Sequence, residues 1–336
     1  MTDDQVSTAD TMRERADESR IKLWLLVGAN RLVVTAVLTA TFFVLFSLGA
    51  LLEPGLSTLL RDRAVIEGLF TSMITAVITT ATLVVTIGQL IVSQENGPLG
   101  EQRQRMSATM DVRSYVAELT GHPAPADPSA FLRALVVATR ERATALEEAT
   151  ADLSNETARG ELEEFVDSIL GNADTVTDKL EGARFGTFDV VHAALDFNYG
   201  WKVFQTERLE DEYADVLDED QRTALQDLRQ SLAMFGPARE HVKTLYFQWD
   251  LINLSRLILY ASVPALLVSG MMVTYVDAMT VVGTTLGVQN LLWLVAAAFT
   301  LTLVPFFLLL AYILRVTTVA KRTLAIGPLI LRDSQR

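Results

Sequence analysis

The most constraining feature of this sequence is the set of long stretches that carry no charge. The uncharged stretches are 21 residues between Arg31 and Glu53, 27 between Glu67 and Glu95, 20 between Arg256 and Asp277, and 37 between Asp277 and Arg315. A helix that rises about 1.5 Å per residue needs about 20 apolar residues to cross about 30 Å of hydrocarbon. Because every stretch is long enough, the sequence predicts an all-α, polytopic membrane protein with four transmembrane helices.

The charged residues gather between the second and third of these stretches. Residues 95–250 contain 30 acidic and 15 basic side chains, a net charge of −15, whereas the whole 336-residue chain has −13. Apolar residues in this region recur at three- and four-residue spacing, which is typical of helices. We therefore predict an acidic helical insert between spans two and three.

These patterns divide the chain into five parts. The predicted parts are a cytoplasmic N-terminal segment at 1–31, transmembrane helices 1 and 2 at 32–94, an acidic helical cytoplasmic domain at 95–250, transmembrane helices 3 and 4 at 251–315, and a basic cytoplasmic tail at 316–336. The first span lies behind an acidic leader and no small-residue cleavage pattern follows it. We therefore expect it to be retained and not removed as a signal peptide.

Capping and breaking residues divide the insert into five predicted helices. Their expected bounds are Pro98 to about Leu119, Pro128 to about Leu153, Asn155 to about Leu180, Thr187 to about Val216, and Asp218 to Gly236. Asp127 is the expected cap before Pro128, and Asp218 with Gln221 has the spacing of a capping box. A last helix is expected to run from Pro237 into the third span.

The distribution of Lys and Arg predicts the orientation in the membrane. Residues 277–290, between spans three and four, contain neither, whereas the N-terminal and C-terminal segments are rich in both. Positive charge is retained on the cytoplasmic side. We therefore expect both termini and the 95–250 domain to be cytoplasmic in a multi-pass protein of the cell membrane.

Composition argues against several kinds of chemistry. The chain has no cysteine, and its three histidines, His122, His192 and His241, lack the spacing of metal ligands. Signatures of phosphate loops, nucleophile elbows and metalloproteases are absent from the sequence. We expect no enzymatic activity, no metal site and no cofactor, and the acidity argues against nucleic acid as a partner.

The surplus acid has two interpretations. The chain contains five Lys against 23 Arg, and its acid-rich, lysine-poor surface would keep a protein soluble in concentrated salt. The alternative is a surface dedicated to binding cations. We favour the first interpretation, which is typical of halophilic proteins.

Span two contains the most informative polar pattern of the chain. Seven residues recur at steps of three and four: Thr71, Thr75, Thr79, Thr82, Thr86, Gln89 and Ser93. At about 100° per residue they fall within an arc of about 80° and form one polar stripe along the helix. The stripe predicts either a pore lining shared by several copies or a face for close helix packing, and it should contact protein or water rather than lipid.

Three segments carry a family resemblance. The stretches are Ser93–Glu101, Phe235–Trp249 and Asn253–Arg256. They resemble a group of haloarchaeal four-span membrane proteins that brings no known activity or functional residues. Two spans, a helical insert and two more spans are also similar in outline to bestrophin-like channels, an analogy of architecture alone.

Two functional hypotheses follow. The first is a non-enzymatic, membrane-anchored interaction or sensory module, in which the stripe packs against other spans of its own chain and the acidic cytoplasmic domain meets a protein partner. The second is a homo-oligomeric ion channel or pore lined by the polar face of span two. The expected partners are the lipid bilayer, further copies of the chain and a cytoplasmic protein.

Overall fold

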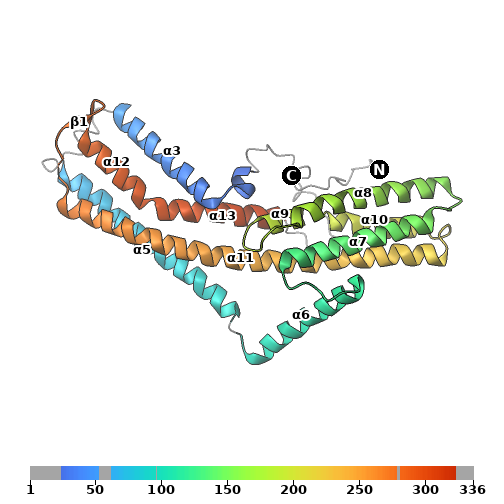
Figure 1. Cartoon of the computed structure of the whole chain (residues 1–336). Helices are drawn as coiled ribbons and strands as arrows, with labels where there is room; N and C mark the ends of the chain where they lie inside the picture. Colours follow the sequence, from blue (N-terminus) through green and yellow to red (C-terminus); the bar gives the residue numbers. More distant parts are fainter. Residues whose placement is uncertain (1–23, 53–61, 96, 278–280, 323–336) are drawn as a thin grey trace. The chain divides into compact units, whose positions relative to one another are not determined.

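The computed structural model describes residues 24–52, 62–95, 97–277 and 281–322, and within them the chain is almost entirely helical (Figure 1). The elements are η1 (Trp24–Gly28), α3 (Arg31–Leu52), α5 (Arg63–Glu95), α6 (Leu99–Thr120), α7 (Pro128–Thr150), α8 (Glu156–Leu180), α9 (Asp189–Leu195), α10 (Tyr199–Glu212), α11 (Glu219–Tyr275), β1 (Thr284–Thr285), β2 (Val288–Gln289), α12 (Asn290–Thr302) and α13 (Val304–Arg322). The prediction of an all-α fold is confirmed for these residues.

Four helices are long and apolar enough to cross a membrane. The candidate spans lie in Arg31–Gly49, Arg63–Ser93, Glu219–Tyr275 and Val304–Lys321. The shorter apolar helix α12 precedes the last of them. Length and composition therefore agree with the four predicted spans.

The chain forms two compact units. One, which we call the helical unit, contains residues 97–247, and the other, the apolar unit, contains residues 24–96 and 248–318. α11 contributes residues to both units. Each unit has its own hydrophobic core.

Three of the helix starts predicted for the helical unit have the expected side-chain caps. The Asp127 side chain accepts a hydrogen bond from Ala130 N at 3.0 Å at the start of α7. Asn155 accepts hydrogen bonds from two backbone N–H groups at the start of α8. Asp218 and Gln221 form a reciprocal capping box, at 2.8 and 3.1 Å. These local signals work because the first N–H groups of a helix need acceptors.

The prediction of one continuous fourth helix in the insert, from Thr187 to about Val216, is wrong. The structure divides it into α9 and α10, and the Thr187 hydroxyl donates back to Arg184 O instead of capping a helix. The break at Asp196 is held by α8, where Asn172 Nδ2 donates to Asp196 O at 2.9 Å and Lys179 pairs with the Asp196 carboxylate at 2.7 Å. These contacts from α8 hold the backbone between α9 and α10 in its non-helical path.

The predicted helix end at Gly236 is also wrong, because α11 continues through Gly236 and Pro237. A Cβ atom on Gly236 would lie 2.8–2.9 Å from the ring and hydroxyl of Tyr199. The Arg239 guanidinium group also lies over the Tyr199 ring, 4.8 Å from the ring centre. The glycine allows α10 to approach α11 closely and does not terminate the helix.

The two span prolines behave differently. α11 continues past Pro264, whereas the fourth span is divided at Leu303 into α12 and α13, two residues before Pro305. Proline cannot donate the backbone hydrogen bond that its position in a helix requires. α12 packs within the apolar unit through Phe299, whose ring centre lies 5.7 Å from that of Phe42.

A small hairpin that the sequence did not predict precedes α12. β1 and β2 pair with Thr284 opposite Gln289, and both turn residues, Leu286 and Gly287, have positive φ. The Thr285 hydroxyl donates to the side chain of Asn290, and the Trp293 ring N–H donates to Thr285 O. The hairpin is therefore tied to the first turn of α12.

We predict that Gly236→Ala destabilises the helical unit. The added methyl must displace the buried Tyr199 ring, and overpacking of this kind costs on the order of 1–3 kcal/mol. The matched control is Gly171→Ala in α8, where nothing lies within 4 Å of the added Cβ. The control should stabilise by about 0.5–1 kcal/mol. Thermal unfolding followed by circular dichroism measures both, and equal shifts for the two variants would contradict the Tyr199 contact.

Candidate functional site: the outward face of α5

The polar stripe of span two lies on the outside of its own chain. All seven side chains, from Thr71 to Ser93, are exposed. The buried side chains of the same helix are apolar and are Ile66, Phe70, Met73, Val77, Val84 and Ile91. At about 100° per residue the centres of these two sets lie about 180° apart. α5 therefore packs into the apolar unit with the face directly opposite the stripe, and the stripe is not buried against any of the residues that the structure describes.

The stripe is longer than the sequence analysis proposed. Ala64 and Gly68 continue the same row toward the start of α5, and both are exposed. We call the nine residues the α5 seam: Ala64, Gly68, Thr71, Thr75, Thr79, Thr82, Thr86, Gln89 and Ser93. No bulky apolar side chain falls on this arc, whereas Ile78, Leu83 and Leu90, beside it, are exposed.

The seam hydroxyls are bonded to their own helix. Thr75, Thr79, Thr82 and Thr86 each donate to the backbone oxygen four residues earlier, at 2.8–3.3 Å. Ser93 donates to Leu90 O at 2.8 Å. Such bonds satisfy the hydroxyl proton without a second helix, and they lower the free-energy cost of placing the hydroxyl group in hydrocarbon. The hydroxyl oxygens remain able to accept a hydrogen bond from outside.

A second cluster, which the sequence analysis missed, lies in the apolar unit around Ala29. Arg31 is buried and donates to four backbone oxygens, with distances from 2.6 Å to Ala29 O to 3.4 Å to Leu26 O. Arg315 is also buried and donates to Ala29 O. One bond of Arg31 reaches Ala311 O of α13 at 3.2 Å. The two arginines therefore clamp the start of α3 to α13, and we call this set the arginine clamp.

The arginine clamp provides hydrogen-bond donors for backbone carbonyl groups near the start of α3. η1 is a π-helical turn that ends before α3 begins, and the arginines bond carbonyl groups of η1 and the carbonyl of Ala29 between the two helices. Unsatisfied backbone groups are costly near hydrocarbon, and guanidinium groups can bond several carbonyls at once. Asp250 of α11 is buried as well, and Tyr312 lies within electrostatic range of Asp250 and both arginines.

The clamp corrects one expectation from the sequence. Arg315 was taken as the charge that ends the fourth span, yet it lies inside the apolar helix Val304–Lys321 and is buried. The available signal was the regular helical spacing of Tyr312, Arg315 and Val319, which are all buried and continue the packed face of α13. Charge counts alone cannot separate a solvated interface arginine from a buried one.

We predict that Arg31→Lys destabilises the apolar unit. A lysine ammonium is a compact donor that cannot reach the oxygens of Ala29, Leu26 and Ala311 together, and the loss should be on the order of 2 kcal/mol. The matched control is Arg63→Lys, because Arg63 is exposed and pairs only with Glu67 four residues on. Its effect should stay below about 0.5 kcal/mol. Thermal midpoints in detergent measure both, and an unchanged Arg31→Lys midpoint would refute the clamp.

The three histidines lie apart from one another in the helical unit. His122 contacts Thr120 O, and His192 lies 3.9 Å from Asp196. His241 lines a pocket beside α6. Among the described residues no group of three or more His, Asp or Glu could hold a metal ion.

Comparison with known proteins gives a family and no activity. No curated protein and no solved structure matches the chain. One family model matches residues 1–336, the full length of the chain. The protein therefore belongs to DUF7972, a family of unknown function.

Proposed function

We propose that this protein is a non-enzymatic integral membrane module that associates with further copies of itself through the α5 seam. The observation that carries the proposal is the exposure of the whole seam on the face opposite the packed side of α5. A row of small and hydroxyl side chains lets two helix backbones approach closely in lipid. Bulky neighbours such as Ile78 and Leu83 would pack along the edges of such a contact.

The energy of association would come from many weak contacts. Close contact between small side chains gives van der Waals attraction, and the Gln89 amide can donate a hydrogen bond to a second copy, a contact worth about 0.6 kcal/mol on average between membrane helices. The seam runs from Ala64 to Ser93, which gives a long row of close contacts. Because the hydroxyl protons are already bonded within α5, a separated copy is also tolerated in lipid. The proposal therefore favours reversible association over a permanent complex.

The charge pattern supports a cell-membrane location with the helical unit in the cytoplasm. Residues 277–290 contain no Lys or Arg, whereas Arg31 begins α3 and Lys321 lies in the last turn of α13. Positive charge is retained on the cytoplasmic side. In this arrangement the acidic helical unit would be the water-exposed, interacting or sensory part of the module.

Single-cysteine cross-linking tests the association, because the chain has no cysteine of its own. Thr79→Cys places a thiol at the centre of the seam, and we expect it to form a disulfide-linked dimer when membranes are oxidised. The matched control is Ala76→Cys, which is exposed at nearly the same depth but lies about 60° from Thr79 around the helix, outside the arc of the seam. Efficient dimers at both positions, or at neither, would contradict the proposal.

A second candidate function is a pore lined by the seam. The observation that favours it is the same outward exposure, because copies of α5 could then surround a common axis with Thr75, Thr79, Thr82 and Thr86 toward water. Hydroxyl oxygens and the Gln89 amide would form a lining without fixed charge. Such a pore would have low intrinsic charge selectivity.

Conductance in planar bilayers separates the two candidates. If the seam lines a pore, wild-type protein should give single-channel currents at high salt. Thr79→Leu and Thr82→Leu should abolish or rescale them, because both remove polarity from the middle of the lining. The control is Leu83→Ile, a substitution of equal volume on the flanking face. If the Thr79→Cys protein cross-links and the wild-type protein is silent, the self-associating module is left as the function.

A further inference from the structure

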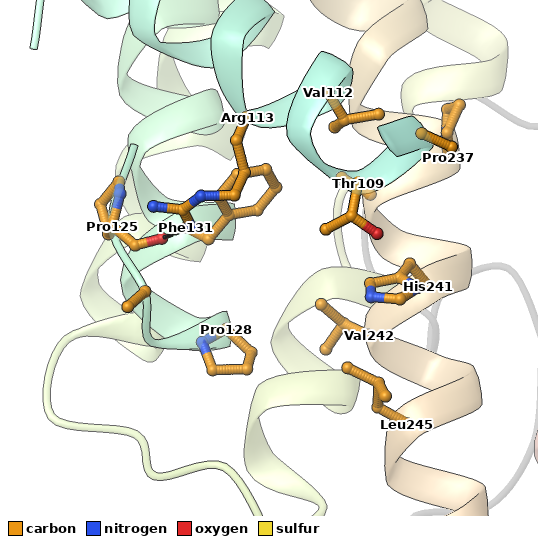
Figure 2. Close-up of a pocket in the computed structure, with 13 residues that line it drawn as sticks. Thr109, Val112, Arg113, Pro125, Pro128, Phe131, Pro237, His241, Val242 and Leu245 are labelled. Atoms are coloured by element: carbon orange, nitrogen blue, oxygen red, sulfur yellow. Dashed lines mark hydrogen bonds between the residues drawn. The ribbon is translucent and has the colours of Figure 1, made fainter. Parts of the chain in front are cut away.

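The helical unit contains a small cavity between α6, the start of α7 and α11 (Figure 2). Its volume is about 310 Å³. Sites for small molecules range from about 300 to 1,000 Å³, so the cavity suits a ring or a short chain and not a large cofactor. The lining residues are Ala108, Thr109, Val112, Arg113, Pro125, Ala126, Pro128, Phe131, Pro237, Ala238, His241, Val242 and Leu245.

Most of the wall is apolar, and its shape follows from small side chains. Three alanines, at 108, 126 and 238, line the space between larger residues and leave it unfilled. Val112, Phe131 and Leu245 supply apolar surface from three different helices. A ligand here would gain most of its binding free energy from apolar contact.

The charge of the wall is opposite to that of the unit around it. Residues 95–250 contain twice as many acidic as basic side chains. Nevertheless no Asp or Glu is among the residues that line the cavity, and its two ionisable side chains are Arg113 and His241. An amine would meet a guanidinium group here, whereas an anion would find a favourable potential.

The two basic side chains are held differently. Arg113 is fixed, because its guanidinium donates to the backbone oxygens of Pro125 at 2.8 Å and Ala124 at 2.5 Å. The His241 ring projects from α11 toward α6, which forms another wall of the cavity, and it lies below Thr109 in Figure 2. Within the described residues the His241 ring makes no hydrogen bond or ion pair. It is therefore available to a ligand, while Arg113 supplies a fixed positive charge.

We propose that this cavity binds a small apolar molecule that carries one carboxylate, with the ring or chain against Val112, Phe131 and Leu245 and the carboxylate bonded to His241. This site is separate from the α5 seam, and the inference does not depend on self-association. It assigns the helical unit a ligand class, a small aromatic or aliphatic acid.

Ligand-observed fluorine NMR tests the proposal on the full chain in lipid nanodiscs. The probes are 4-(trifluoromethyl)benzoate and 4-(trifluoromethyl)benzyl alcohol, which share one apolar body and differ in charge. Signals from empty nanodiscs are subtracted to remove partition into lipid. We expect the benzoate to bind at least about fivefold more tightly than the alcohol, a factor that corresponds to about 1 kcal/mol.

Variants identify the site. His241→Leu should weaken benzoate binding about fivefold and remove the preference over the alcohol. His122→Leu is the matched control, because His122 lies outside the cavity, and it should leave both affinities unchanged. Ala238→Phe should fill the cavity and weaken both probes more than tenfold. His241 is exposed, so its variant keeps the test valid if the filled variant fails to fold.

Three results would overturn the proposal. They are benzoate signals no larger than those of empty nanodiscs, equal affinities for the two probes, and a His241→Leu variant that binds the benzoate like the wild type. Disulfide formation by the Thr79→Cys protein should be the same with and without the benzoate. A failure of ligand binding is thereby distinguished from a failure of self-association.

Discussion

The satisfaction of polar groups at the border of hydrocarbon governs the apolar unit. A backbone group near lipid cannot turn to water, so each carbonyl and N–H needs a partner within the protein. The arginine clamp meets this requirement where η1 gives way to α3, because two guanidinium groups converge on Ala29 O and one also reaches α13. The threonines of α5 meet it by bonding within their own helix. In both cases the polar groups are satisfied within the chain, so helix packing does not have to supply their hydrogen bonds.

That internal satisfaction explains why the α5 seam can lie outside its own chain. A hydroxyl that has already donated its proton costs little when it faces lipid, and it still accepts a bond from another copy or from water. The bulky side of α5, with Phe70 and Val77, is used for the core of the apolar unit. The helix thus uses one face for folding, and the opposite face, which carries the seam, is exposed and open to the association proposed above.

The helical unit follows the ordinary rules of helix capping and packing. Its caps at Asp127, Asn155 and Asp218 were predictable from the sequence, because each depends on residues within three or four positions of one another. The close approach at Gly236 and the break at Asp196 were not, because each depends on a residue far away in the chain, Tyr199 in one case and Asn172 in the other. The cavity beside His241 has the same origin, since it is enclosed by side chains from α6, α7 and α11.

The sequence by itself determined the four apolar helices, the helical nature of the acidic region and the polar row on α5, because hydrophobicity, capping and helical period are local properties. Only the tertiary structure decided which way that row points, whether Arg315 is buried, where α9 ends, and that Pro305 rather than Pro264 accompanies a break. Each of these depends on which neighbour a side chain meets across the fold. The period of a helix defines its faces, but packing alone selects the face that is turned inward.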